Sequence, residues 1–424
     1  MTAPTRTRPR LVTPTARPLS TRPEARGSAS PSARTDAAPS AKRSARTTAT
    51  TRRRGLLNLP GRRTPSFLAL VALVGLLSIT GLVMVLSASS ASSQATYGSP
   101  WYQFQRQLMW LGISLAALGI AVRIDYRSWR AAIRPGMALT FAMLVAVLVP
   151  GVGRTVNGSS RWLGVGPFTV QPSELAKLVL LLFTADLLAR RAKKIDQTQL
   201  TLRPVLVVFG AAAGLIMLQP NLGTTVLIFV ILMTMLFVSG VPLKSLGITL
   251  AIFGGVGVAF AVLEPYRMRR LSAFADPWAD PLNTGYQTLQ SQAALANGGA
   301  VGQGLGQGRA KYGFLPEGHT DFIFSNIGEE LGLLGAVVLL VVFVAIAVYG
   351  IRVAMHAPDR FGMLVATGVT TWILVQAFVN LGAVVGVLPI TGVPLPFVSF
   401  GGSSLIVTMA AFGLLLNVAR QSDA

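Results

Sequence analysis

Long apolar segments recur along almost all of this sequence. About ten of them are long enough, at roughly 17–25 residues, to cross a lipid bilayer as helices. Charged residues make up only 12% of the chain and hydrophobic residues 52%, whereas a soluble domain is typically about 25% charged. We therefore expect an all-α polytopic membrane protein with about ten transmembrane helices. The segments are 66–87, 106–122, 133–150, 174–190, 203–219, 222–240, 245–263, 322–350, 361–387 and 401–418.

A basic tail precedes the first segment. Residues 1–63 hold 15 Lys and Arg but only Glu24 and Asp36, which accounts for +13 of the formal net charge of +22. Because this composition cannot bury enough apolar surface, we expect residues 1–65 to be disordered. The tail either attracts anionic lipid headgroups or an acidic partner, or is a solvated tail that only helps to set topology. Since the charge excess is concentrated there, we expect no nucleic-acid partner.

The basic residues between the segments predict which side each loop faces. If the tail is cytoplasmic, cytoplasmic stretches carry 13 Lys and Arg and outside stretches carry eight, five of them in one long loop, where the positive-inside rule has least force. The first segment lies too far along the chain for a cleaved signal peptide, so we interpret it as a signal anchor. We expect a transmembrane domain over 66–418, both termini in the cytoplasm, including a short tail over 419–424, and a large outside loop over about 264–321.

That large loop is rich in Pro and Gly, which predicts irregular structure. No P-loop lysine follows its glycines, so we exclude nucleotide binding. A Gly-rich loop is either simply flexible or allows the backbone to approach a ligand closely. The chain has no cysteine, which excludes disulfides, thiol catalysis and Cys-ligated metals. Its two histidines are far apart, so a His-rich metal site is not expected.

Ionisable residues also occur inside the apolar segments. Glu174 and Lys177 are three residues apart, on one face of the predicted helix. Such residues are costly in a membrane and usually face a partner or a cavity. The two are either a structural ion pair or part of a polar cavity for a charged headgroup. The adjacent Glu329 and Glu330 point in different directions on a helix, so at most one can face a given cavity; for Asp186 we expect a packing role.

Charges of both signs gather in the large loop. Guanidinium groups bind phosphate in a bidentate way, and a partly desolvated carboxylate can have a pKa suited to a general base. Each residue taken alone could be an ordinary solvated charge, but together they indicate an outward-facing site for an anionic lipid substrate. They are Arg267, Arg269, Arg270, Asp276 and Asp280 in one cluster, and Glu317, His319 and Asp321 in the other.

Several long motifs resemble those of one family, the SEDS proteins (shape, elongation, division and sporulation), which are membrane peptidoglycan glycosyltransferases. The resemblance runs from about 66 to 418 and is closest to the division branch, because of DPWADP and the basic tail. The motifs are MVLSASS (84–90), NGSSRWLGVGPFTVQPSELAK (157–177), QPNLGT (219–224), YRMRRLSAFADPWADP (266–281), GYQTLQSQAALANGG (285–299), LPEGHTDFIFSNIGEELGLLG (315–335) and LPITGVPLPFVSFGGSSL (388–405).

The resemblance implies an activity and its partners. It implies polymerisation of lipid II, the undecaprenyl-pyrophosphoryl disaccharide pentapeptide, into glycan strands outside the bacterial cytoplasmic membrane, at the division septum. It also implies a class B penicillin-binding protein as transpeptidase partner, together with other divisome proteins. Two alternatives are a lipid II flippase, although no obvious internal repeat supports one, and a non-catalytic scaffold that recruits the transpeptidase.

The resemblance also implies roles for individual residues. Asp321 matches the family's essential loop aspartate and would take the proton from the acceptor sugar's 4-hydroxyl; coordination of a divalent cation, Mg²⁺ or Mn²⁺, is the alternative role. Trp162 would stack on a sugar or anchor at the membrane interface. In QPNLGT, Asn221 stands where many relatives carry Asp, which puts a cation-binding role for that position in doubt. The remaining candidates for binding the anionic substrate are Arg161, Glu174, Lys177, Arg267, Arg270, Glu317 and His319.

Overall fold

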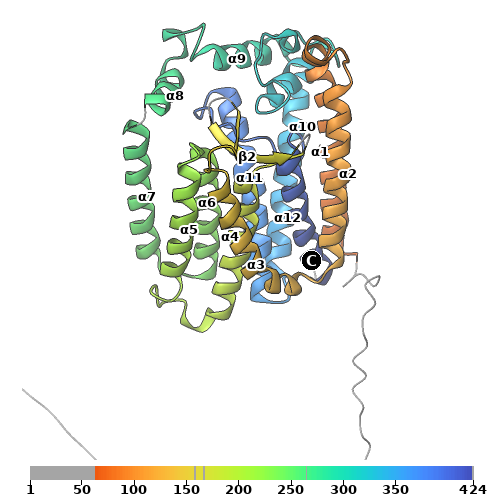
Figure 1. Ribbon diagram of the computed structural model, residues 1–424. Helices are drawn as coiled ribbons and strands as arrows, with labels where there is room; N and C mark the ends of the chain where they lie inside the picture. The colour runs from red at the N-terminus through yellow and green to blue at the C-terminus, as the bar shows by residue number, and fades with distance from the viewer. Residues whose placement is uncertain (1–62, 157–158, 166–167, 264, 423–424) are drawn as a thin grey trace, which may run out of the picture. The chain divides into compact units, whose positions relative to one another are not determined.

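The computed structural model describes residues 63–156, 159–165, 168–263 and 265–422 (Figure 1). All of them lie in one unit that spans Arg54–Ala424. The predicted disordered tail over 1–65 falls almost entirely outside the described residues and stays a prediction. The last residues, which we predicted to be a short tail, continue the final helix as far as Gln421.

Ten helices correspond to the ten apolar segments. Seven of the described helices, α1, α2, α6, α7, α10, α11 and α12, are long and apolar enough to cross a membrane. Of the others, α3 and α5 are shorter and α4 carries four charged residues. The all-α polytopic membrane fold is confirmed. The bounds are α1 Pro65–Tyr97, α2 Tyr102–Arg123, α3 Ile133–Ala146, α4 Pro172–Arg190, α5 Leu202–Met217, α6 Leu222–Ser239, α7 Leu243–Leu263, α10 Ile323–Met355, α11 Arg360–Val385 and α12 Gly402–Gln421.

Local sequence signals set the ends of several helices. The side chains of Thr64, Asn221 and Asp359 each accept a backbone N–H at the start of α1, α6 and α11, which satisfies donors that a helix leaves unpaired. Gly240 and Gly386 end α6 and α11 in the left-handed conformation that suits glycine. Asn221 therefore has a structural role as an N-cap, and Asn and Asp are about equally effective there.

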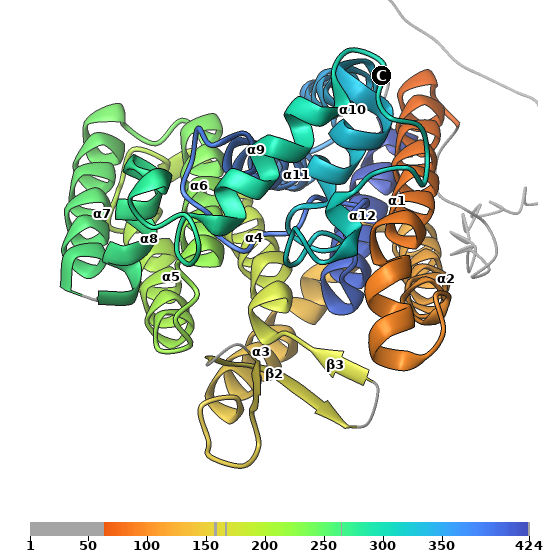
Figure 2. The same cartoon turned by 90° about the horizontal axis from the view of Figure 1, so that it is seen from above.

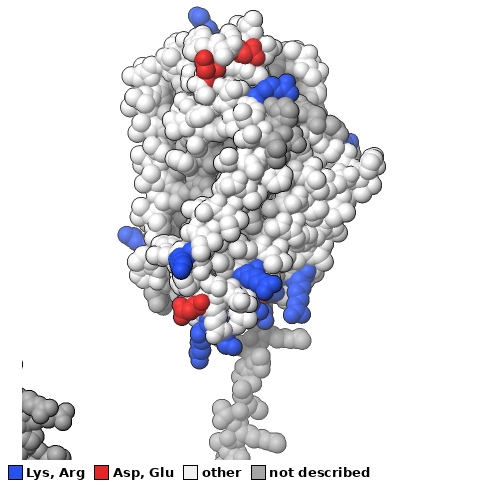
Figure 3. All heavy atoms as spheres, turned by 90° about the vertical axis from the view of Figure 1, so that its left-hand side faces the viewer, with Lys and Arg blue, Asp and Glu red and all other residues white. Residues whose placement is uncertain are grey.

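The centre of the bundle is formed by α4, α6, α11 and α12 (Figures 1 and 2). Most of the apolar core of α11 and α12 is buried, whereas α7 is largely exposed. Helix α7 lies at the edge, where Phe253 stacks on Phe229 with ring centroids 3.6 Å apart. In Figure 3 the charged side chains lie toward the two ends of the face shown, and the broad middle is uncharged. A lipid bilayer would cover such an apolar middle.

The start of α1 and the end of α12 lie at the same end of the bundle. The Thr64 hydroxyl donates to the Ala419 carbonyl at 2.9 Å. Close by in the fold, the Asn417 amide donates to the carbonyls of Ala121, Val122 and Ile124 at the end of α2. The two ends of the described chain thus lie on one side, in agreement with the predicted topology. We call the opposite end, which carries α8 and α9, the loop end.

The loop end is more regular than the sequence predicts. The large loop contains α8 (Pro265–Ala275) and α9 (Tyr286–Gly298), so the expectation of irregular structure is only partly correct. Three short antiparallel strands, in the order β1-β2-β3, also went unpredicted: β1 Arg154–Val156, β2 Ser159–Val165 and β3 Phe168–Val170. Short 3-10 helices complete the described elements: η1 Tyr126–Ala132, η2 Ala192–Lys194, η3 Pro277–Ala279 and η4 Ala310–Tyr312.

The Gly-rich stretch of the loop is fixed by two buried carboxylates on α10. Glu329 accepts the backbone N–H groups of Arg309 and Ala310 at 3.0 and 3.1 Å, and Glu330 accepts that of Gly306 at 2.9 Å. Each glutamate side chain is only 1% exposed. Glu330 also accepts the Ser87 hydroxyl of α1 at 2.6 Å. Both glutamates therefore position the backbone of the same Gly-rich stretch.

The same packing interrupts α10 at Gly332. Its φ of 68° and ψ of −168° are accessible essentially to glycine alone, and a Cβ there would lie 2.3 Å from the Gly302 nitrogen. We expect Gly332→Ala to destabilise the protein by about 1–3 kcal/mol through backbone strain and about 1–3 kcal/mol through overpacking. Thermal unfolding in detergent measures this, with Gly75→Ala in open helical surroundings as the matched control. Equal melting temperatures for both variants would contradict the argument.

Candidate functional site

Asp321 lies in a tightly held segment that precedes α10. The Asn380 amide on α11 donates to the Asp321 carbonyl at 2.7 Å. The Ser399 hydroxyl donates to the Thr320 carbonyl at 2.6 Å, and the Asn326 amide on α10 donates to Gly318 at 2.8 Å. Side chains from α10, α11 and the segment before α12 therefore fix the backbone on which the carboxylate is carried.

The Asp321 carboxylate itself is chemically available. It accepts no hydrogen bond from any residue in the part of the chain that the structure describes. Burial and the nearby Glu317 charge raise its pKa to about 6, although Arg270 and Arg161 pull it down. A base whose pKa lies near the working pH combines a useful deprotonated fraction with a good driving force for proton transfer. A raised pKa of this kind suits a general base.

Two arginines from different elements face this carboxylate. Arg161 on β2 donates to the carbonyls of Gln219 and Pro220 at 2.9 and 2.6 Å. Arg270 on α8 donates to the Ile390 carbonyl at 2.9 Å. Both lie near enough to Asp321 to stabilise its charged form. Two fixed cations around one carboxylate provide a place for an anionic group beside the proton acceptor.

The other loop candidates have distinct surroundings. Glu317 is exposed, and its carboxylate accepts the Thr320 hydroxyl at 2.8 Å. Burial lowers the pKa of His319, which favours the neutral imidazole at physiological pH. Trp162 is half-buried on β2 beside Arg161. The backbone of Arg267 belongs to α8, but its side chain lies outside the described residues, so its predicted role has no structural account.

Glu174 and Lys177 form an ion pair in the interior of the bundle. Their charged groups are 2.7 Å apart, and the two residues are only 4% and 2% exposed. The Lys177 ammonium also donates to the Gln376 side-chain oxygen at 3.1 Å and lies 4.7 Å from the centre of the Trp372 ring. The i, i+3 pairing predicted from the sequence is present. Both predicted roles, a structural ion pair and a polar site for a charged headgroup, are compatible with these contacts.

Helix α11 connects that pair to Asp321. Gln376 and Asn380 are one helical turn apart, and their amides donate to the consecutive carbonyls of Pro394 and Val393, each at 2.9 Å. Asn380 also holds Asp321. Gln376 and Asn380 were not among the residues predicted from the sequence. The signal was present, since two polar residues spaced by four in an apolar helix mark one polar face.

The described residues contain no group of three or more His, Cys, Asp or Glu side chains that could hold a metal. Mg²⁺, however, is often held by one or two carboxylates together with substrate phosphates and water. Asp321 and an incoming diphosphate would provide a donor set of that kind. Asp321 would therefore fit a divalent cation that binds together with a diphosphate.

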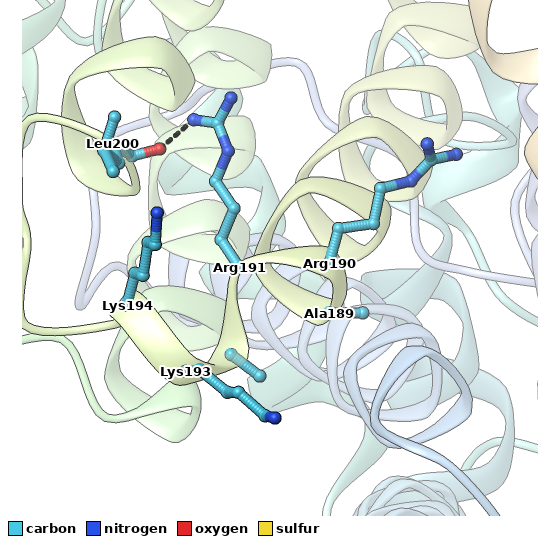
Figure 4. Close-up of a pocket in the computed structure, with 7 residues that line it drawn as sticks. Ala189, Arg190, Arg191, Lys193, Lys194 and Leu200 are labelled. Atoms are coloured by element: carbon cyan, nitrogen blue, oxygen red, sulfur yellow. Dashed lines mark hydrogen bonds between the residues drawn. The ribbon is translucent and has the colours of Figure 1, made fainter.

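Two cavities lie at opposite ends of the bundle. One of about 270 Å³ lies at the loop end, between α8, α9 and residues 388–390, and includes Arg270. The other, of about 620 Å³, lies at the far end and is lined by residues from the end of α4 and from η2 (Figure 4). There Arg191 donates to the Leu200 carbonyl. No predicted site residue lines this second cavity, so we assign it no part in the reaction.

Comparison with known proteins gives several extensive matches. Stage V sporulation protein E of Bacillus subtilis is 40% identical over 362 residues, which is 85% of this chain and 99% of that protein. The probable peptidoglycan glycosyltransferase FtsW of Geobacter metallireducens is 41% identical over 341 residues, with 80% and 90% covered. FtsW of Mycobacterium tuberculosis is 42% identical over 360 residues, with 85% and 69% covered.

Solved structures show the same architecture. A chain of a peptidoglycan synthase complex that coordinates polymerization and crosslinking matches with a TM-score of 0.70 at 32% identity, covering 83% of this chain and 97% of that one. RodA of Thermus thermophilus matches with a TM-score of 0.61 at 29% identity, covering 84% and 97%. The family profile of the FtsW, RodA and SpoVE cell cycle proteins matches residues 67–424. The chain therefore belongs to this family, the SEDS proteins.

Proposed function

We propose that this protein is a peptidoglycan glycosyltransferase that polymerises lipid II into glycan strands. The observation that carries the proposal is the half-buried Asp321 carboxylate, with a pKa of about 6, facing Arg161 and Arg270. The activity named for the FtsW relatives, at about 40% identity, supports the same reaction. Lipid II as substrate and the septum as location are parts of this proposal.

The geometry gives each group a step in the reaction. Asp321 accepts the proton of the acceptor sugar's 4-hydroxyl as that oxygen bonds to the anomeric carbon of the donor. The bond from this carbon to the donor's pyrophosphate breaks, and negative charge grows on the leaving group. Arg161 and Arg270 stabilise that charge because their guanidinium groups are already held in place by backbone carbonyls. Neutral His319 can donate a hydrogen bond nearby.

We include a divalent cation in the proposal. Mg²⁺ or Mn²⁺ held by Asp321 together with the substrate's diphosphate would act as a Lewis acid toward the leaving group. If Asp321 serves chiefly as this ligand, chelation removes activity that Mg²⁺ or Mn²⁺ restores. If Asp321 acts as base alone, chelation leaves the rate unchanged.

The proposed function also includes a transpeptidase partner and an orientation of the protein in the membrane. The related synthase complex couples polymerization to crosslinking, which supports a class B penicillin-binding protein as partner, within a larger divisome assembly. The basic residues favour cytoplasmic termini and a loop end that faces outside the cytoplasmic membrane. In that orientation Asp321 meets substrate on the side where the cell wall is built.

Polymerisation of purified lipid II tests the proposal directly. The full-length protein is co-purified with its penicillin-binding protein, and the products are separated by gel. Long glycan strands are expected from the complex. If no polymer forms while fluorescent lipid II crosses vesicle membranes, the protein is a flippase. If neither activity is present with a competent partner, the protein is a scaffold and the proposal is wrong.

A further inference from the structure

We propose that the loop-end cavity of about 270 Å³ binds the carboxylate-bearing peptide of the substrate, with Arg269 as its anchor. This inference rests on the proposed function, because it names the part of the substrate that this cavity receives. Arg269 was noted in the sequence only as one member of a basic cluster. Both Arg269 and Arg270 line the cavity, but Arg270 is bonded to the Ile390 carbonyl.

The wall of the cavity has a defined chemistry. Arg269 and Arg270 come from α8, and Asn283, Thr284, Gln287 and Thr288 come from the start of α9 and the residues before it. No carboxylate lines the cavity. Phe274 and residues 388–390 supply apolar surface to the same cavity. Guanidinium, amide and hydroxyl groups with one apolar side match a ligand that has carboxylates and amides.

Three of the six polar side chains that line the cavity already have partners. Asn283 and Thr284 both donate to the Asp280 carboxylate, at 2.9 Å and at 3.1–3.2 Å, and these bonds hold the pKa of Asp280 below its usual value. Arg270 is bound to the Ile390 carbonyl. In the described part of the chain, the side chains of Arg269, Gln287 and Thr288 have no hydrogen-bond or ion-pair partner. The cavity thus offers one cation, one amide and one hydroxyl to a ligand.

The position of Arg270 indicates which part of the substrate enters. Its guanidinium borders the cavity and is also near enough to lower the pKa of Asp321. The leaving diphosphate belongs at the Asp321 side, where Arg161 and Arg270 act together. Because Arg270 takes part in both places, the cavity would receive a group attached to the reacting sugar. In lipid II that group is the peptide, which carries free carboxylates and amides.

The test compares two substrates with two arginine variants. Polymerisation kinetics are measured with lipid II and with the same lipid-linked disaccharide lacking its peptide. A hydrogen bond to a charged group contributes about 1.5–3 kcal/mol, so we expect Arg269→Ala to raise KM for lipid II roughly 10-fold or more. We expect kcat to change less than twofold. For the substrate without peptide, Arg269→Ala should match wild type. Arg309→Ala removes another exposed loop arginine outside the cavity and should change neither KM nor kcat for lipid II.

The outcomes separate this inference from the function on which it rests. An equal rise in KM for both substrates would place the diphosphate, not the peptide, at Arg269 and overturn the inference. Unchanged kinetics for Arg269→Ala would also overturn it. Gln287→Ala provides a second variant, with a smaller rise in KM expected for lipid II alone, and unfolding curves verify that both variants fold. If wild type makes no polymer from lipid II, the proposed function itself fails, whatever the variants do.

Discussion

Asp321→Asn should reduce glycan polymerisation by about 10²–10⁴-fold, the usual contribution of a general base. Asparagine has nearly the same size and keeps the backbone carbonyl that Asn380 holds, but it cannot accept the proton. Polymerisation from lipid II measures the loss. Asp196→Asn, an exposed position between η2 and α5, is the matched control and should retain full activity. Polymer at wild-type rates from Asp321→Asn would remove this carboxylate from the mechanism.

The pH dependence follows from the same carboxylate. Its pKa of about 6 lies above the ordinary 3.8, so the wild-type rate should rise as pH increases through 6 and the base loses its proton.

Between about pH 4 and 6 the folded state binds more protons at Asp321 than the unfolded state, so this group makes folding less favourable as pH rises. Asp321→Asn removes that penalty. At pH 7.5 the inactive variant should unfold at the same temperature as wild type or higher, as thermal unfolding in detergent would show.

Lys177→Met should destabilise the protein by about 3–5 kcal/mol, because it leaves Glu174 as an uncompensated buried charge. Lys177 is the ion-pair partner of Glu174 at 2.7 Å and also serves Gln376 and Trp372. Methionine conserves much of the volume of lysine, so the loss of stability measures the removal of the charge more than the creation of a cavity. Apparent melting temperature and yield of the purified protein measure it.

A double substitution distinguishes structure from substrate binding at this pair. Lys177→Met combined with Glu174→Gln removes both charges, and its stability should recover most of the loss, since paired removal of a buried ion pair is often neutral. If the double variant folds and still polymerises lipid II, the pair is structural. If it folds with wild-type stability but binds no lipid II, the predicted substrate role of Glu174 and Lys177 is correct.

The transmembrane helices could be predicted because apolar length alone marks them. The segment predicted over 361–387 is α11, Arg360–Val385, and the largest differences have local reasons. Helix α1 continues beyond residue 87 to Tyr97 through small and polar residues that are not apolar enough to extend the predicted segment. Helix α3 stops at Ala146, four residues before Pro150. By contrast, α9 lies outside the apolar segments and has mixed polarity, so the same criterion missed it.

The site could be predicted only in part. Asp321 and the arginines were identified from motif and charge, but the groups that fix Asp321 were not. Asn380 and Ser399 hold this segment from 59 and 79 residues away along the chain, and no local pattern encodes such contacts. The buried Glu329 and Glu330 raised the opposite problem. From the sequence, at most one of them could face a given cavity, and the structure shows that both bind backbone N–H groups of the Gly-rich loop.

The contacts of Lys177 have a consequence for biogenesis. Its partner Gln376 follows 199 residues later in the chain, so at about 5–20 residues per second of translation it emerges roughly 10–40 s after Lys177. Throughout that interval α4 must reside in or near the membrane with the Glu174–Lys177 pair, while Gln376 has not yet been synthesised. Nascent chains that stop before α11 should therefore be recognised by membrane quality-control proteases, and only completion of the last two helices would secure the earlier ones.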